Sequence, residues 1–531
     1  MRTTPAAIRD DFFANHVEAN PEEGSTLGLR EHAGRLSDPS TDAARAELAR
    51  LRETLRALDH VAIDTLTDAA LQLDLDATLR AARFHARYLE KDMHATNLEL
   101  AAFPNGAMQH AALHSRSAAD HADVVARARA VPAFLDAHRR NLGRGRAEGR
   151  LPARPVASTF VARVLPGAAS STRALGAEGI VPPDVATAAS DAFVGFARFL
   201  EDEIMPMAPP LLRLGPEETA FRIRDVMGIE GSIDELLAHA RDALADAQRR
   251  MMHHAGVSKL ADAREALTTL FVDTPASIEE ALASYRREID AATRMVKERA
   301  LVPVPDHLAL DLAPLPAGMA DGSGFTNWPA PLLDREGRGH ALYAKDPAAH
   351  PRIMAKQLGV HECIPGHYLQ SVMWQRRLCD SPDRAVRFLG VTDDVAMSRG
   401  YFGTMVSVEG WAVAMEHLMR EQGFFEEGPE LFFLAWCNAI HAVRVLLDLE
   451  LHAGDRDWDS LVRMVADATL MSDGWAAAQV IRSLRIPLQG STYMIGAHEI
   501  LELRKRSPVP ILELHQALLD LGPVPISRVR L

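Results

Sequence analysis

Cysteine is scarce in this sequence of 531 residues, because only Cys363, Cys379 and Cys437 occur. Three cysteines cannot build the disulfide framework on which small secreted domains depend. The first residues, 1–11, are charged and lack the apolar stretch that a secretory signal needs. No uninterrupted apolar run reaches the length of about eighteen residues that a membrane helix requires. We therefore expect a cytoplasmic protein without a membrane span.

An excess of positive charge is also missing, since 58 lysines and arginines stand against 72 aspartates and glutamates, a net charge of −14. This balance disfavours the phosphate backbone of nucleic acids and anionic lipid surfaces as main partners. The sequence contains no repeat of fixed period and no low-complexity tract, which disfavours solenoid folds. The composition predicts no particular oligomeric state.

Long stretches rich in alanine, leucine, arginine and glutamate have helical periodicity and predict a mainly α fold with few short strands. Helices are expected over residues 43–58, 71–100, 117–142, 233–253, 404–421, 430–452, 458–471, 474–484 and 512–519. Prolines and glycines disfavour long helices over 301–351. We expect a helical N-terminal region at 1–300, a connector at 301–351 and a helical C-terminal region at 352–531. The best strand candidates are 156–164 and 340–344.

The segment VHECIPGHY, residues 360–368, carries the strongest functional signal. It resembles the zinc-hydrolase sequence HExxH, in which two histidines on one helical face bind the metal and the glutamate activates water. Here His361 and His367 are six residues apart, which is about 120° around a straight helix. A straight helix would therefore not bring both histidines to one ion.

Pro365 and Gly366 provide a break between the two histidines. Proline lacks an N–H and clashes with the carbonyl four residues earlier, while glycine adopts positive φ at low cost. A kink or stop there could bring His367 back toward His361, with Glu362 beside the metal. The alternative is an ordinary Pro-Gly helix end with two incidental histidines, in a chain that has 22 of them.

Glu409 and Glu416 lie on one face of an otherwise apolar helical segment, 408–416. A carboxylate on an apolar face needs a partner. A metal held by His361, His367 and Glu409 would be such a partner and would leave a fourth position for water. The alternative for a helical glutamate is a solvated edge or an ion pair with arginine.

A polar stripe crosses the apolar segment 430–452 and consists of His441, Arg444, Asp448 and His452. Arg444 and Asp448 have the spacing of an i,i+4 ion pair, which is one interpretation. In the functional interpretation, Asp448 orients a histidine that binds metal or faces the substrate, and His452 faces the cleft.

Tyr493 lies in a segment, 482–496, whose proline and glycines interrupt the helical pattern. A phenol held on a loop can donate a hydrogen bond to the oxyanion that forms when water attacks an amide carbonyl. The alternative is a core tyrosine whose hydroxyl bonds a backbone carbonyl.

Together these segments resemble the bacterial family known as domain of unknown function 885. The family pattern HEAIPGHHLQ corresponds to residues 361–370, EGWA to 409–412, and RxxxDxxxH to Arg444, Asp448 and His452. Later PxQ and YxIG patterns correspond to Pro487, Gln489, Tyr493, Ile495 and Gly496. Weaker likeness at 21–22 and 26–28 extends the resemblance over nearly the whole chain.

The resemblance implies a large helical, oligopeptidase-like (gluzincin-like) fold with a deep cleft, similar to thimet oligopeptidase and carboxypeptidase Taq. The N-terminal region would form one wall of that cleft. The implied activity is that of a zinc-dependent peptidase or amidase on short peptides or small amides, although other divalent metals also suit a His/His/Glu site. Dipeptidyl peptidase III, which also lengthens the histidine spacing of its zinc motif, is similar in this respect.

The resemblance also implies roles for single residues. Glu362 would be the general base, and Tyr493, together with His452, would stabilise the oxyanion. Substrate would be bound by Arg444 and Gln489. Asp448 and Glu416 would orient the groups that contact the metal or the substrate.

Four positions depart from the family pattern, namely Cys363, Tyr368, Ala414 and Met494, where alanine, histidine, tyrosine and lysine are expected. The candidate ligands are kept, so these departures bear on substrate preference. Two other functions therefore stay open: processing of a specialised non-peptide metabolite, and a relative that binds metal or ligand without turnover. The intact Glu362 argues against the second, because a binding protein has no use for the base.

Overall fold

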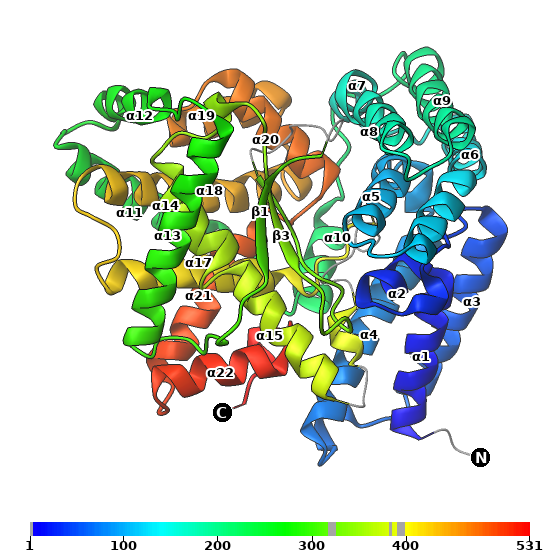
Figure 1. Cartoon of the computed structure of the whole chain (residues 1–531), viewed down its shortest axis with the longest axis horizontal. Helices are drawn as coiled ribbons and strands as arrows, with labels where there is room; N and C mark the ends of the chain where they lie inside the picture. The colour runs from blue at the N-terminus through cyan, green and yellow to red at the C-terminus, as the bar shows by residue number, and fades with distance from the viewer. Residues whose placement is uncertain (1–3, 317–324, 382–384, 390–398, 531) are drawn as a thin grey trace.

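Helices dominate the protein, which confirms the mainly α class with few short strands. The computed structural model describes residues 4–316, 325–381, 385–389 and 399–530. Figure 1 shows the N-terminal helices gathered in one group, the later helices in a second, and a small sheet between them. Residues 317–324 of the expected connector lie outside the described residues.

The N-terminal group is made of helices of very different length. They are α1 (Pro5–Ala19), α2 (Pro21–Leu27), α3 (Thr41–Leu58), α4 (Ala69–Glu90), α5 (Glu99–Leu113), α6 (Ala118–Ala147), α7 (Arg154–Thr159), α8 (Leu165–Ala177) and α9 (Pro183–Phe199). Shorter turns are η1 (Arg30–His32), η2 (Ile63–Thr65), η3 (Met93–Ala95), η4 (Phe160–Val164) and η5 (Leu200–Ile204). Helix α10 (Pro216–Phe221) and η6 (Arg222–Val226) lead to the second group.

The second group contains the segments with candidate chemistry. Its helices are α11 (Ile233–Ala255), α12 (Ala263–Val272), α13 (Ile278–Glu298), α14 (Met354–Leu358), α15 (His367–Asp380), α17 (Met405–Glu421), α18 (Pro429–His452), α19 (Trp458–Thr469), α20 (Asp473–Arg485), α21 (Ser491–Arg506) and α22 (Ile511–Leu521). Shorter turns are η7 (Leu260–Asp262), η8 (Pro347–Ala349), η9 (Gly359–Cys363), η10 (Val386–Phe388) and η11 (Ile526–Arg528).

One predicted helix is divided in the structure. The expected helix 71–100 is interrupted after Glu90, where Asp92 takes the left-handed conformation with φ of 51°. Helix α11 packs along α18, and Met251 shares an apolar cluster with Phe432. In space, α11 therefore lies with the second group.

Side-chain caps fix where several helices begin. Ser232 accepts a hydrogen bond from the backbone N–H of Glu235, and the Glu235 side chain bonds back to the Ser232 N–H, which completes a capping box before α11. Asp457 and Ser472 cap the starts of α19 and α20, where each side chain accepts a hydrogen bond from one backbone N–H of the helix. These caps explain why the second group follows the sequence pattern closely.

The sheet has three strands, β1 (Leu310–Pro314), β2 (Phe325–Trp328) and β3 (Gly339–Tyr343), in the order β1-β3-β2. Strand β3 is parallel to β1 and antiparallel to β2, and it confirms the predicted strand at 340–344. Asn327 on β2 donates a hydrogen bond to the Glu362 carbonyl at 3.1 Å. The sheet therefore supports the segment that carries the histidine motif.

The other predicted strand, 156–164, is wrong, because these residues form α7 and η4. Val156 and Phe160 are buried in a cluster of apolar side chains from neighbouring helices. A short apolar run suits a buried helix as well as a strand, and here the helical packing partners decide.

Helices α17 and α21 cross with their backbones in contact. A Cβ atom at Gly410 would lie 2.4 Å from the backbone carbon of Gly496, and one at Gly496 would lie 2.0 Å from the Val406 carbonyl oxygen. Only glycine allows so close an approach. The crossing places Glu409 and Tyr493, which precede the two glycines, at one point of the molecule.

Helix α18 is long and apolar enough, by length and composition alone, to cross a membrane. In the structure, however, 78% of its most apolar window is buried inside the protein. Apolar neighbours from α11, α17 and α19 cover it, as expected for the central helix of a core.

We predict that Gly410→Ala and Gly496→Ala each lower the free energy of unfolding, by about 1–3 kcal/mol, since an added methyl group overpacks a backbone contact. Chemical denaturation followed by circular dichroism measures the change. Gly143→Ala in α6 is the matched control, because its Cβ would meet no atom within 4 Å. It should leave stability unchanged or raise it by up to about 1 kcal/mol. Equal effects at all three positions would contradict the crossing.

Candidate metal centre

The histidine motif lies at a break between two helices. Helix α14 continues into the π-helical turn η9, which carries His361 and ends at Ile364 in an extended conformation. Helix α15 begins at His367, directly after Pro365 and Gly366. The predicted stop at this Pro-Gly pair is confirmed, and Trp411 fastens it by donating from Nε1 to the Pro365 carbonyl at 2.9 Å.

Gly366 is needed for a reason other than the expected positive φ, because its φ is −76°. A Cβ atom at this position would lie 1.7 Å from the carbonyl oxygen of His361 and 2.4 Å from that of Val360. The chain thus folds back onto the turn that it has just left. This close approach brings His367 to His361, with their ring centres 5.0 Å apart.

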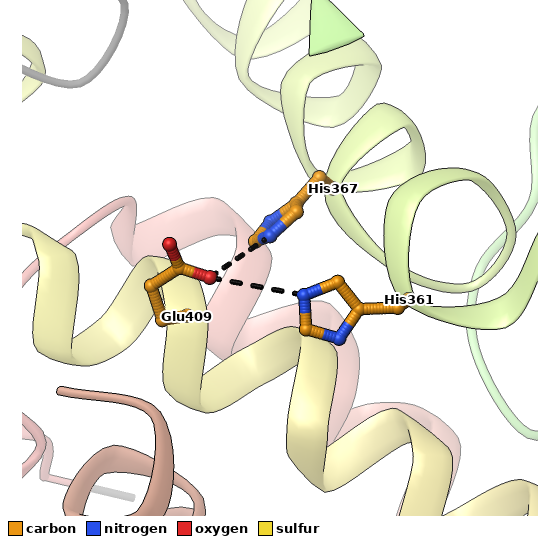
Figure 2. A group of neighbouring side chains, drawn as sticks. All are labelled: His361, His367 and Glu409. Carbon is orange, nitrogen blue, oxygen red and sulfur yellow. Dashed lines mark hydrogen bonds and ion pairs between the residues drawn. The ribbon is translucent and has the colours of Figure 1, made fainter. Parts of the chain in front are cut away.

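Three side chains converge at this point, as Figure 2 shows. Oε2 of Glu409 lies 3.2 Å from Nε2 of His367 and 3.8 Å from Nε2 of His361. All three potential ligand atoms lie within 4.8 Å of one another. Ligand atoms about 2.1 Å from a tetrahedral zinc ion are roughly 3.4 Å apart, so the spacing and the donor types suit a divalent cation.

Buried partners hold two of these groups. Nδ1 of His361 lies 2.6 Å from Oε1 of Glu416, which also accepts a hydrogen bond from Gln357. Oε1 of Glu409 accepts a hydrogen bond from Nε2 of Gln489 at 2.9 Å. These contacts leave Nε2 of His361 and Oε2 of Glu409 to face the common point, which is how outer partners orient metal ligands.

The acidic neighbours of His361 favour its protonated form when no cation is bound. Burial disfavours the charged imidazole, but hydrogen bonds to Glu409 and Glu416 outweigh it and hold the pKa of His361 well above its usual range. Burial also opposes the ionised Glu409, yet its bonds to His361 and His367 hold its pKa well below the usual range. A cation at this point would take over the role of that proton.

Glu362 follows His361 directly and belongs to the same turn. Burial raises the pKa of its carboxyl group above the usual range, against the opposite effect of His361 and His367. A carboxylate with a raised pKa exchanges protons more readily near neutral pH than an ordinary one.

Tyr493 lies in the first turn of α21, not on the predicted loop. Its ring is nearly parallel to those of His361 and His441, with centres 6.1 and 5.2 Å away. Its hydroxyl lies 3.2 Å from a guanidinium nitrogen of Arg482 and 3.4 Å from Nε2 of Gln489. The Gln489 amide therefore contacts both the phenol and the candidate ligand Glu409.

The structure does not bring His452 to this centre. Its side chain is buried, and Nε2 bonds the Ser483 carbonyl at 3.0 Å. His441, eleven residues earlier and therefore about 16 Å away along the helix, is the histidine beside Tyr493. Asp448 orients no histidine either, since it accepts hydrogen bonds from Ser483 and Ser491.

Three of the four departures from the family pattern face the protein interior. Cys363, Tyr368 and Ala414 are at most 1% exposed, and Met494 is partly buried against an apolar cluster. The departures therefore change packing around the centre more than the candidate ligands themselves.

Two polar residues of the centre escaped the sequence analysis. Gln357 lies four residues before His361, a spacing that places both on one helical face and could have identified it. Arg482 contacts Tyr493 across a helix boundary, and no spacing rule connects them.

We predict that the protein binds one divalent cation and that Glu409→Ala weakens binding by more than about 100-fold. Glu416→Gln should cost about 10- to 100-fold, as losing an outer partner does. Titration with Zn²⁺ against a chromophoric chelator measures both. Since a proton on His361 competes with the cation, affinity should fall as the pH is lowered. Unchanged binding by Glu409→Ala would contradict the ligand assignment.

We also predict that Gly366→Ala abolishes cation binding, because the added Cβ would force the His361 and His367 backbones apart. Gly359→Ala, in the same turn, is the control, because its Cβ would meet its nearest atom at 3.5 Å. The same chelator titration applies, with circular dichroism to check the fold. Retained binding by Gly366→Ala would show that the close approach is dispensable.

Comparisons with known proteins reveal solved structures of similar fold over nearly the whole chain. The chain matches a structure from Colwellia psychrerythraea described as a "putative lipoprotein", with a TM-score of 0.77 and 15% identity over 99% of this chain and 98% of that one. A "putative lipoprotein of unknown function" from Shewanella oneidensis has a TM-score of 0.73 and 16% identity over the same shares of the two chains. At these identities the likeness shows the fold alone. No curated protein matches.

The family comparison covers nearly the whole length of the chain. The model of the family described as "Bacterial protein of unknown function (DUF885)" matches residues 21–530, and the chain therefore belongs to this family.

Proposed function

We propose that this protein is a zinc-dependent hydrolase of peptide or amide bonds in short peptides or small molecules. The convergence of His361, His367 and Glu409 within 4.8 Å, with Glu362 next to the first ligand, carries the proposal. Two nitrogen donors and one oxygen donor are a set found in catalytic zinc sites, which keep a further position open. The same donor set also suits manganese, iron or cobalt.

The chemistry of such a centre would be shared between the ion and the protein. When bound there, a divalent cation acidifies water and polarises a carbonyl oxygen. Glu362 accepts the proton of the attacking water as the water oxygen bonds to the carbonyl carbon. It then delivers this proton to the nitrogen as the carbon–nitrogen bond breaks. The raised pKa of Glu362 suits both transfers.

In this proposal Tyr493 donates a hydrogen bond from its hydroxyl to the developing oxyanion. Arg482 and Gln489 both donate toward the phenol oxygen, so the O–H is left to point elsewhere. Glu416 meanwhile keeps His361 in the tautomer and orientation that present Nε2.

A cavity of about 440 Å³ lies between the two helix groups and is lined from one side by Tyr88 and Leu151 and from the other by Leu484 and Pro487. None of the candidate ligands lines it, and neither Glu362 nor Tyr493 does, so its volume does not measure the space at the metal centre. The deep cleft and the oligopeptidase likeness expected from the sequence stay predictions.

The cellular location is part of the proposal. The sequence predicts a cytoplasmic protein, whereas both solved relatives are described as lipoproteins. Fractionation of cells that express the full-length gene distinguishes the two.

We predict that Glu362→Gln lowers hydrolysis of a short-peptide library by about 100-fold or more, because the amide cannot accept the proton of the attacking water. Zinc binding should be kept, as shown by metal analysis of the same preparation. Glu336→Gln, at an exposed position outside the centre, serves as the control and should keep full activity. Full activity of Glu362→Gln with zinc bound would refute the mechanism, and a wild-type protein without affinity for zinc would refute the function.

A further inference from the structure

Two arginines beside the candidate metal centre form no ion pair with any residue that the structure describes. Arg444 on α18 and Arg482 on α20 flank Tyr493, with guanidinium carbons 5.1 and 5.8 Å from its ring centre. Arg444 donates to Oε1 of Gln479 at 3.1 Å, and Arg482 donates to Oε1 of Gln489 at 2.6 Å. Within the described part of the chain, neither guanidinium lies within 4.0 Å of a carboxylate oxygen.

Asp448 and Glu409, whose charges act on both arginines, are engaged elsewhere. Asp448 follows Arg444 by one helical turn and has the spacing of an i,i+4 ion pair. Its oxygens instead accept hydrogen bonds from the Ser483 hydroxyl and from the N–H and hydroxyl of Ser491. Glu409 faces the two histidines and Gln489. The ion pair that the sequence suggested for Arg444 is therefore not formed.

Three other poorly exposed arginines of this protein form ion pairs, whereas the buried Arg127 donates to the Ala107 carbonyl. Arg399 meets Glu47 at 2.8 Å, Arg387 meets Asp74 at 3.4 Å, and Arg504 meets Glu421. A guanidinium taken out of water without a counter-charge is costly. Burial and then the charge of Arg482 lower the pKa of Arg444 to about 10. Burial also opposes the charge of Arg482, but Tyr493 outweighs it and raises the pKa of Arg482. Both residues are only partly buried, so each keeps part of its surface exposed to solvent.

We propose that Arg444 and Arg482 form a subsite for a substrate carboxylate, next to the amide bond that is cleaved. A planar guanidinium binds a carboxylate through two parallel hydrogen bonds. Two guanidiniums also provide positive charge that attracts the carboxylate. This inference rests on the proposed hydrolase function and narrows its substrate class. The substrates are dipeptides or N-acylated amino acids with a free carboxylate on the residue whose nitrogen leaves.

The arginines and the candidate metal ligands lie close together, and this closeness determines how far the substrate carboxylate is from the amide bond that is cleaved. Arg482 contacts the Tyr493 hydroxyl, and Gln489 links the same hydroxyl to Glu409. One amide side chain therefore spans the gap from phenol to candidate ligand. An anion at the arginines and an amide carbonyl at the metal centre fit within one residue of a substrate, so cleavage occurs at the carboxyl-terminal end of a peptide.

Kinetics on matched substrates test this subsite. Zinc-loaded protein is offered dipeptides of small apolar residues as free acids, as carboxyl-terminal amides, and as amides with a glutamyl side chain at the second position. We expect kcat/KM to favour the free acids by about 10- to 100-fold, the usual effect of a charge-assisted hydrogen bond. Preference for the glutamyl amides over the apolar amides would assign the subsite to a side-chain carboxylate and overturn the end-on placement.

Variants show whether charge or packing produces the preference. Arg444→Gln should remove most of the preference for the free acid, and Arg444→Lys should restore part of it, because it keeps the charge but not the planar fork. Arg504→Gln, whose partner is Glu421, is the matched control and should keep the preference. A preference that survives Arg444→Gln would overturn the assignment of Arg444.

Binding to the Glu362→Gln variant separates this inference from the proposed function. Calorimetry with the same free acids and amides requires no turnover. Tighter binding of free acids, lost in the double variant with Arg444→Gln, supports the subsite even if the wild-type protein hydrolyses none of them, which would refute only the hydrolase. Equal affinity for acids and amides, or no binding of either, would overturn the subsite whatever the activity.

Discussion

Close contact between backbones, without side chains in between, is the constraint on which the candidate centre depends. At Gly366 the chain folds back onto the carbonyl of His361, and at Gly410 helix α17 meets Gly496 of α21. The first contact brings the two histidines together, and the second brings Glu409 to Tyr493. Each contact excludes even a methyl group. The positions of the candidate ligands are thus set by main-chain packing, which is stiffer than any arrangement of flexible side chains.

Charged side chains are distributed unevenly around the centre that the backbone contacts position. His361 lies between Glu409 and Glu416, so the candidate ligands are surrounded by negative charge. The side around Tyr493 has the opposite excess, because Arg444 and Arg482 form no ion pair among the described residues. This polarity gives the proposed binding region a direction.

The sequence predicted those features of the fold that depend on residues close together in the chain. The Pro365-Gly366 stop, the helices that begin at Ser232 and Ser472, and strand β3 follow from propensities and caps within a few residues. The convergence of His361, His367 and Glu409 also agrees with the spacing argument, although the reason for Gly366 does not. Tertiary packing decided the rest. Residues 156–164 became helical among apolar helices, Tyr493 entered a helix despite Pro487 and Gly490, and the partners of Asp448 come from two other elements. Arg482 could not be found, because its neighbours are set by a helix crossing that no spacing rule describes.

The crossing of α17 and α21 divides the binding region into a fixed half and an adjustable half. Glu409 and Tyr493 lie on helices whose backbones are in contact at glycine, so neither can shift without the other. The arginines lie on α18 and α20, outside this crossing. Exchanging those long side chains would therefore leave the spacing between Glu409 and Tyr493 unchanged.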